Sequence, residues 1–79
     1  MKIWKLLRTG FEHPRSFTWE TIYLDPLVAN NEMFEQYDRR FHLYKEDAII
    51  AEFHPTTCAN LVLKDGRRWT WAIDMLEVA

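Results

Sequence analysis

Residues 59–73 have the sequence ANLVLKDGRRWTWAI and decide the fold. Two apolar runs flank Lys64-Asp65-Gly66, a pattern that predicts a β-hairpin. A two-residue Asp-Gly turn would mix apolar and polar side chains on both faces. A three-residue loop separates the faces, with Gly66 in the left-handed region that glycine enters without a Cβ clash. We therefore predict the longer loop, which pairs Leu61 with Trp69.

This register divides the hairpin into two faces. The face expected in the core carries Ala59, Leu61, Leu63, Trp69, Trp71 and Ile73. The opposite face carries Asn60, Val62, Arg68, Thr70 and Ala72. Each tryptophan can bury roughly 150–250 Å². We expect Trp69 and Trp71 to anchor the core, which removes both indoles from any surface that stacks on nucleic-acid bases.

The composition is that of one small folded domain covering residues 1–79. A chain this short buries only about 60–65% of the surface that it exposes when unfolded, but aromatic residues bring much apolar area for few positions. The formal charge of −2 supplies neither a strong basic field for phosphates nor the dense acid that mimics DNA. Charge alone therefore selects no partner.

Cysteine use and hydropathy indicate the compartment. Cys58 is the single cysteine, so an intrachain disulfide is impossible and a reducing environment fits better. No apolar run approaches the ~18 residues that span a bilayer, and the apolar start at residues 1–5 is too short for a signal peptide. We expect a soluble cytoplasmic protein without a membrane partner, in the host cytoplasm if a phage encodes it.

The N-terminal third predicts two strands. Residues 2–9 are apolar on both faces and end at Gly10, which favours a strand, with a helix as the competing interpretation. Residues 12–16 lack periodicity and are expected to form a loop. Residues 17–24 have strong strand propensity and alternate regularly. The two strands are expected to pair as a hairpin.

The middle of the chain predicts one helix. Asp25-Pro26 is a good helix start, but Asn30-Asn31 weakens an unbroken helix. We therefore expect a turn at residues 25–29 and the main helix from about Asn31. Its stripe facing the sheet is expected to consist of Phe34, Tyr37, Phe41 and Tyr44. Residues 41–45 could equally end the helix or begin a strand.

The element order predicts the fold class. Residues 48–53 form the next expected strand, with Ile49, Ala51 and Phe53 on one face, and Pro55 ends it. Residues 74–79 are expected to be a helical turn or a strand tail. The result is a single small α+β domain, a mostly antiparallel sheet of four to five strands in the order ββαβββ packed on one helix.

Apolar residues on both faces of several strands exceed what one helix can cover. Trp4 and Leu6 oppose Ile3 and Leu7 within a single strand. Two explanations remain open. Either the sheet is strongly curled and fills its own concave side, or a second protein, including a second copy of this chain, covers the free face.

The chemistry-bearing residues predict neither catalysis nor a cofactor. His54 and Cys58 are four apart, but a nucleophilic cysteine needs a base within hydrogen-bond reach and a group that orients the base. A structural zinc needs four ligands at characteristic spacings, and these are missing. The carboxylates form no acid-base pair, and the chain has no glycine-rich phosphate loop. We expect a non-enzymatic protein without metal or cofactor.

Nucleic-acid binding is the alternative function. Arg67-Arg68-Trp69-Thr70-Trp71 places cations beside aromatic rings, as in proteins that bind single strands. Arg39 and Arg40 could extend such a patch. The predicted register weakens this hypothesis, because both tryptophans then face the core.

Protein binding is the favoured function, because aromatic residues and arginine anchor interfaces. The expected binding residues are Arg67, Arg68, Arg39, Arg40, Tyr44 and Ile22. Short chains without catalytic motifs are often encoded by phages or other mobile elements, so an inhibitor of a host protein assembly is the specific form that we expect. An antitoxin or regulatory subunit is a further alternative.

Overall fold

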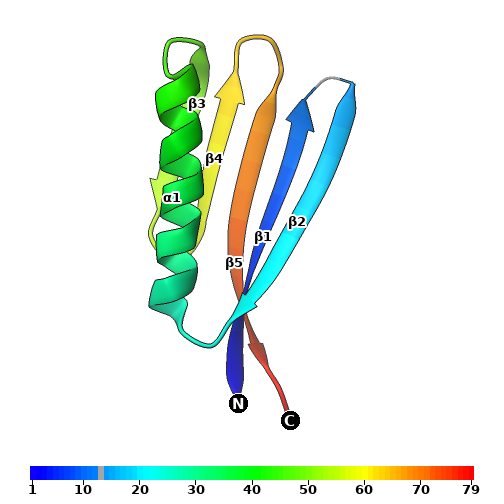
Figure 1. Cartoon of the computed structure of the whole chain (residues 1–79), viewed down its shortest axis with the longest axis vertical. Coiled ribbons are helices and arrows are strands. Elements are labelled where there is room, and N and C mark those ends of the chain that lie inside the picture. Colours follow the sequence, from blue (N-terminus) through cyan, green and yellow to red (C-terminus); the bar gives the residue numbers. More distant parts are fainter. Residues whose placement is uncertain (13) are drawn as a thin grey trace.

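The computed structural model describes residues 1–12 and 14–79, and the predicted loop position of His13 lies outside them. The elements follow the predicted order ββαβββ (Figure 1). They are β1 (Lys2–Glu12), β2 (Arg15–Tyr23), α1 (Pro26–Tyr44), β3 (Ala48–His54), β4 (Cys58–Leu63) and β5 (Arg68–Glu77). The predicted α+β class is confirmed, and residues 74–77 continue a strand.

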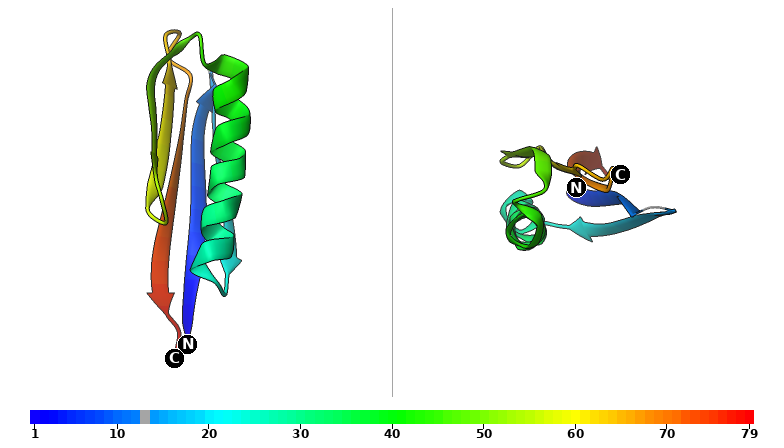
Figure 2. Two further views of the ribbon diagram at one scale, coloured as in Figure 1. Left: turned by 90° about the vertical axis from the view of Figure 1, so that its left-hand side faces the viewer. Right: turned by 90° about the horizontal axis from the view of Figure 1, so that it is seen from above.

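All five strands form one antiparallel sheet in the order β2-β1-β5-β4-β3. The first and last strands therefore pair in its centre. The edge strands β2 and β3 do not pair with each other, so the sheet is open and does not close into a barrel. Figure 2 shows α1 along one side of the sheet. The other face is left uncovered by any described residue.

The terminal hairpin has the predicted register. Leu61 lies opposite Trp69, and the amide of Leu63 donates to the carbonyl oxygen of Arg67 at 2.8 Å. Gly66 has a φ of 95°, the left-handed conformation that the three-residue loop requires. Trp69 is 1% exposed and Trp71 is fully buried. Both indoles therefore anchor the core, as predicted.

The helix start was predicted only in part. Asp25 is the N-cap, and its Oδ1 accepts from the amide of Leu27 at 2.8 Å. The predicted turn at residues 25–29 and start near Asn31 are wrong, because α1 runs unbroken from Pro26 to Tyr44. Asn30 does not break it, since its Oδ1 accepts from the amide of Thr56 at 2.6 Å. This hydrogen bond ties the first half of α1 to the loop between β3 and β4.

The buried stripe of α1 is shifted from the predicted one. Tyr37, Phe41 and Tyr44 pack on the core, but Phe34 is 46% exposed and touches only the edge of the core, with its ring 5.3 Å from that of Phe53. The buried residues of the helix are Ala29, Met33, Gln36 and Tyr37. The correct stripe thus contains a polar residue in its centre.

The bulge in β3 changes one predicted face. The register shifts between Ala48 and Ile50, so Ile49 leaves the alternation and is exposed. Ala51 and Phe53 remain opposite Leu61 and Ala59, as their common face requires.

Gly10 does not end β1, contrary to the prediction. The strand continues to Glu12, which pairs with Arg15, so the predicted loop at residues 12–16 is also wrong at Glu12, Arg15 and Ser16. Gly10 instead lies under the ring of Phe17 on β2. A Cβ at this position would be 2.4 Å from Cζ of that ring. Glycine therefore serves close packing between two strands.

Replacing Gly10 with alanine is expected to lower the free energy of unfolding by about 1–3 kcal/mol, because the new methyl group forces the Phe17 ring out of place. Urea denaturation of G10A, F17L and the double variant measures this. The cost of G10A should shrink in the F17L background, which leaves more room. Simple additivity of the two changes would contradict the proposed contact.

Candidate functional site

The predicted binding residues lie in three places. Arg39, Arg40 and Tyr44 line one groove, and the guanidinium carbon of Arg67 lies 4.8 Å from the ring centroid of Tyr44. Arg68 points to the uncovered sheet face, where it lies over Phe11 at 5.4 Å. Ile22 is exposed at the far end of β2. The structure therefore brings together four of the six predicted residues.

We call the groove between α1 and β1 the arginine groove. It has a volume of about 330 Å³. Its lining residues are Arg8, Glu12, Glu32, Gln36, Arg39, Arg40, Leu43 and Tyr44. The helix residues come mainly from its C-terminal half, and the β1 residues come from the part of the strand that pairs with the beginning of β2.

Arg8 is held rigidly in this groove. Its Nη1 donates to Oε1 of Gln36 at 2.8 Å, and its guanidinium carbon lies 5.3 Å from the ring of Trp19 and 5.8 Å from that of Phe17. Its Nε is buried and finds no acceptor within the described part of the chain. Arg8 thus has a fixed position with hydrogen-bonding capacity left over.

Gln36 joins three elements. Its Oε1 accepts from both Arg8 on β1 and Nε1 of Trp71 on β5, the latter at 3.1 Å. Its Nε2 donates to Oε1 of Glu32 at 2.8 Å. Gln36 and Arg8 were not among the residues predicted from the sequence. The sequence did contain one indication of Arg8: side chains alternate between the two faces of a strand, so Arg8 shares a face with the buried Leu6.

The cations of the groove are incompletely neutralised. Among the described residues, no carboxylate forms an ion pair with Arg8, Arg39 or Arg40. Arg40 lies over the Trp69 ring at 5.5 Å. Burial lowers the pKa of the Arg40 guanidinium below its ordinary value, nearby Arg8 lowers it further, and Glu12 opposes both. The groove therefore favours an anionic group.

Arg67 belongs to the loop rather than to the groove. Its amide donates to Oδ1 of Asp65 at 3.0 Å, and its Nε donates to Oδ2 at 2.8 Å. These bonds, first that of the backbone amide, lower the pKa of Asp65 below its usual range. Asp65 thus neutralises Arg67, which leaves this arginine less able to attract an external anion.

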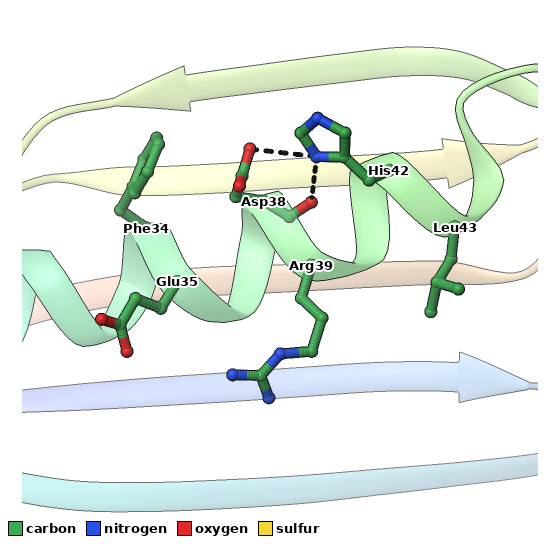
Figure 3. A pocket seen from close by; sticks show the side chains of 6 residues that line it. All are labelled: Phe34, Glu35, Asp38, Arg39, His42 and Leu43. Carbon is green, nitrogen blue, oxygen red and sulfur yellow. Dashed lines mark hydrogen bonds and ion pairs between the residues drawn. The ribbon is translucent and has the colours of Figure 1, made fainter.

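A larger depression lies on the solvent side of α1, with a volume of about 820 Å³ (Figure 3). Its lining residues are Phe34, Glu35, Asp38, Arg39, His42 and Leu43. His42 Nδ1 lies 3.3 Å from Oδ1 of Asp38, and Figure 3 shows this pair on the other side of the helix from Arg39. It is an open helix surface and not an enclosed site.

His54 and Cys58 come closer together than their spacing indicated. They lie directly opposite each other in the β3–β4 pair, and His54 Nε2 is 3.4 Å from Oε2 of Glu52. The hydrogen bonds of the described residues include none between His54 and Cys58. The contact that would activate the thiol is therefore missing from this arrangement.

The end of the molecule that carries both termini is apolar. Figure 1 shows the two termini beside the end of β2 and the start of α1. Exposed large apolar side chains gather here and form what we call the apolar end: Met1, Ile22, Leu24, Leu27, Val28, Met75, Leu76 and Val78. The other exposed large apolar side chains of the described residues are Phe34, Leu43, Ile49 and Ile50.

Neither a metal site nor a membrane-spanning helix is found in the part of the chain that the structure describes. In residues 1–12 and 14–79, no three His, Cys, Asp or Glu side chains gather as metal ligands would. Within the same residues, no helix is both long and apolar enough to cross a bilayer.

No family model, curated protein or solved structure matches this chain. The functional argument therefore rests on the geometry of its own residues.

Replacing Gln36 with leucine is expected to reduce the free energy of unfolding by about 2–3 kcal/mol, because the donors of Trp71 and Arg8 lose their acceptor inside the protein. Asn31→Leu, the same chemical change on the exposed side of α1, should have little effect. Chemical denaturation measures both.

A double-mutant cycle isolates the bond to the indole. In a Trp71→Phe background the Q36L change leaves one fewer donor without a partner, so its cost should fall by about 1 kcal/mol. An unchanged cost would show that the bond contributes nothing to stability.

Proposed function

We propose that this chain is a small non-enzymatic binding module for another protein, and that the apolar end is its docking surface. The observation that carries this proposal is the gathering of most exposed large apolar side chains at one end of the molecule. Apolar patches on a small domain are costly in water and usually mark contact sites.

The surroundings of the apolar end support an interface. Charged residues of both signs border it: Lys2 lies opposite Glu77, and Lys5 Nζ is 4.0 Å from Oε2 of Glu20. An apolar centre with a charged border is the usual anatomy of a protein interface. Ile22, one of the predicted binding residues, lies at this end and pairs with Lys5 of the charged border.

An inhibitor of a protein assembly is the specific form that we propose. Its apolar side chains are concentrated at one end, while the arginine groove occupies the region near the C-terminal half of α1. A molecule with one docking end would cover a subunit contact of its partner without offering an equivalent contact to the next subunit. Such a cap stops growth of the assembly.

The hairpin version of nucleic-acid binding has less support. Trp69 and Trp71 are buried and cannot stack on bases. Arg67 is paired with Asp65, and Arg68 lies on the other face of the sheet. The arginines and tryptophans of residues 67–71 thus do not form one surface.

Replacing Ile22 with aspartate is expected to weaken the complex by at least about tenfold, because it replaces an exposed apolar side chain of the docking surface with a charge. Ile49→Asp is the matched control, since Ile49 is 61% exposed and Ile22 is 56% exposed. Affinity capture with the tagged protein, quantified by mass spectrometry, measures how much of the stoichiometric partner is recovered by each variant and by the wild type.

Light scattering on the purified chain tests whether a second copy is the partner. A dimer that I22D dissociates and I49D does not would identify the chain itself. A monomeric wild type that captures no stoichiometric partner, or equal losses in both variants, would refute the docking role of the apolar end.

A further inference from the structure

We propose that the arginine groove binds an acidic peptide segment of a protein, with a carboxylate held by Arg8 and Arg40. This site is separate from the apolar end, and the proposal does not depend on that surface having a partner.

The groove carries more positive than negative charge, since the arginines that line it outnumber Glu12 and Glu32. Arg8, Arg39 and Arg40 line it together, and none forms an ion pair with a carboxylate of the described residues. A partly buried cation without a counter-charge is unfavourable. A carboxylate from outside would supply the missing charge at a place where water screens it less than at the open surface.

The position of Arg8 suits a carboxylate. The bond to Gln36 and the rings of Trp19 and Phe17 hold the guanidinium before any ligand arrives. Little side-chain freedom remains to be lost on binding. Guanidinium groups bind carboxylates through charge-assisted hydrogen bonds, and the bond from Nη1 to Gln36 leaves Nη2 of Arg8 without an acceptor among the described residues.

The composition of the groove favours a peptide over a nucleic acid. Glu12 and Glu32 line the same groove and interrupt its positive charge. They would repel the phosphates that a nucleic acid holds along its backbone, whereas the flexible side chains of a peptide can turn their carboxylates toward the arginines and away from Glu12 and Glu32. Leu43 and Tyr44 offer apolar contact to the aliphatic part of such a segment.

A fluorescent hexaglutamate peptide is the probe, titrated with the whole chain and followed by anisotropy at low and at physiological ionic strength. We expect saturable binding that Arg40→Gln weakens about tenfold or more and Arg39→Gln weakens less, since Arg39 is more exposed. Lys2→Gln removes the same charge away from the groove and should have little effect. Two-dimensional NMR spectra confirm that each variant remains folded.

Arg8→Lys separates geometry from charge. It keeps the positive charge but loses the two-pronged guanidinium, so hexaglutamate should bind more weakly to this folded variant. Affinity equal to that of the wild type would overturn the assignment of Arg8 as an anchor.

Three other results would overturn the proposal. They are the absence of saturable hexaglutamate binding to the wild type, an equal loss of affinity in K2Q and R40Q, and tighter binding of oligothymidylate than of hexaglutamate with the same dependence on Arg40. The last would identify a phosphate site. None of these results concerns Ile22, so they are distinguishable from failure of the apolar end.

Discussion

The structure depends on burying the indole of Trp71 without leaving its N–H group unpaired. Trp71 lies on β5 beneath α1, and Gln36 of the helix accepts its hydrogen bond at 3.1 Å. The same oxygen accepts from Arg8 of β1. One amide therefore connects the helix with two central strands of the sheet. Tyr37 packs its ring edge-on against the same indole, at 5.9 Å between centroids.

This constraint explains why a charged side chain lies on the core face of the sheet. Leu6 and Arg8 share that face of β1, but Arg8 lies where the helix and β1 leave a groove. Gln36 and the aromatic rings of β2 hold its guanidinium there. Packing the Trp71 indole and presenting a positive charge thus use the same hydrogen-bonding group. A substitution of Gln36 would therefore affect both the packing of Trp71 and the position of Arg8.

Local patterns were sufficient to predict the strands but not the contacts that join them. The 59–73 hairpin follows from alternation and from one glycine, because both act over a few residues. Gln36 and Trp71 are 35 residues apart, and Asn30 and Thr56 are 26 apart. No periodicity encodes such bonds. For this reason the start of α1 was predicted too late and Arg8 was missed. Arg39, Arg40 and Tyr44 were predicted from residue type alone, because arginine and aromatic side chains anchor interfaces, and the structure places all three along one groove.

The pairing of β1 with β5 has a consequence for how the chain folds. Lys2 lies opposite Glu77, and the amide of Val78 donates to the carbonyl oxygen of Met1 at 2.7 Å. The central ladder thus closes a loop of nearly the whole chain, which is entropically expensive and slows folding. During synthesis on the ribosome, the β1–β2 hairpin keeps its inner edge, that of β1, unpaired until β5 emerges. Aggregation competes with folding during that interval.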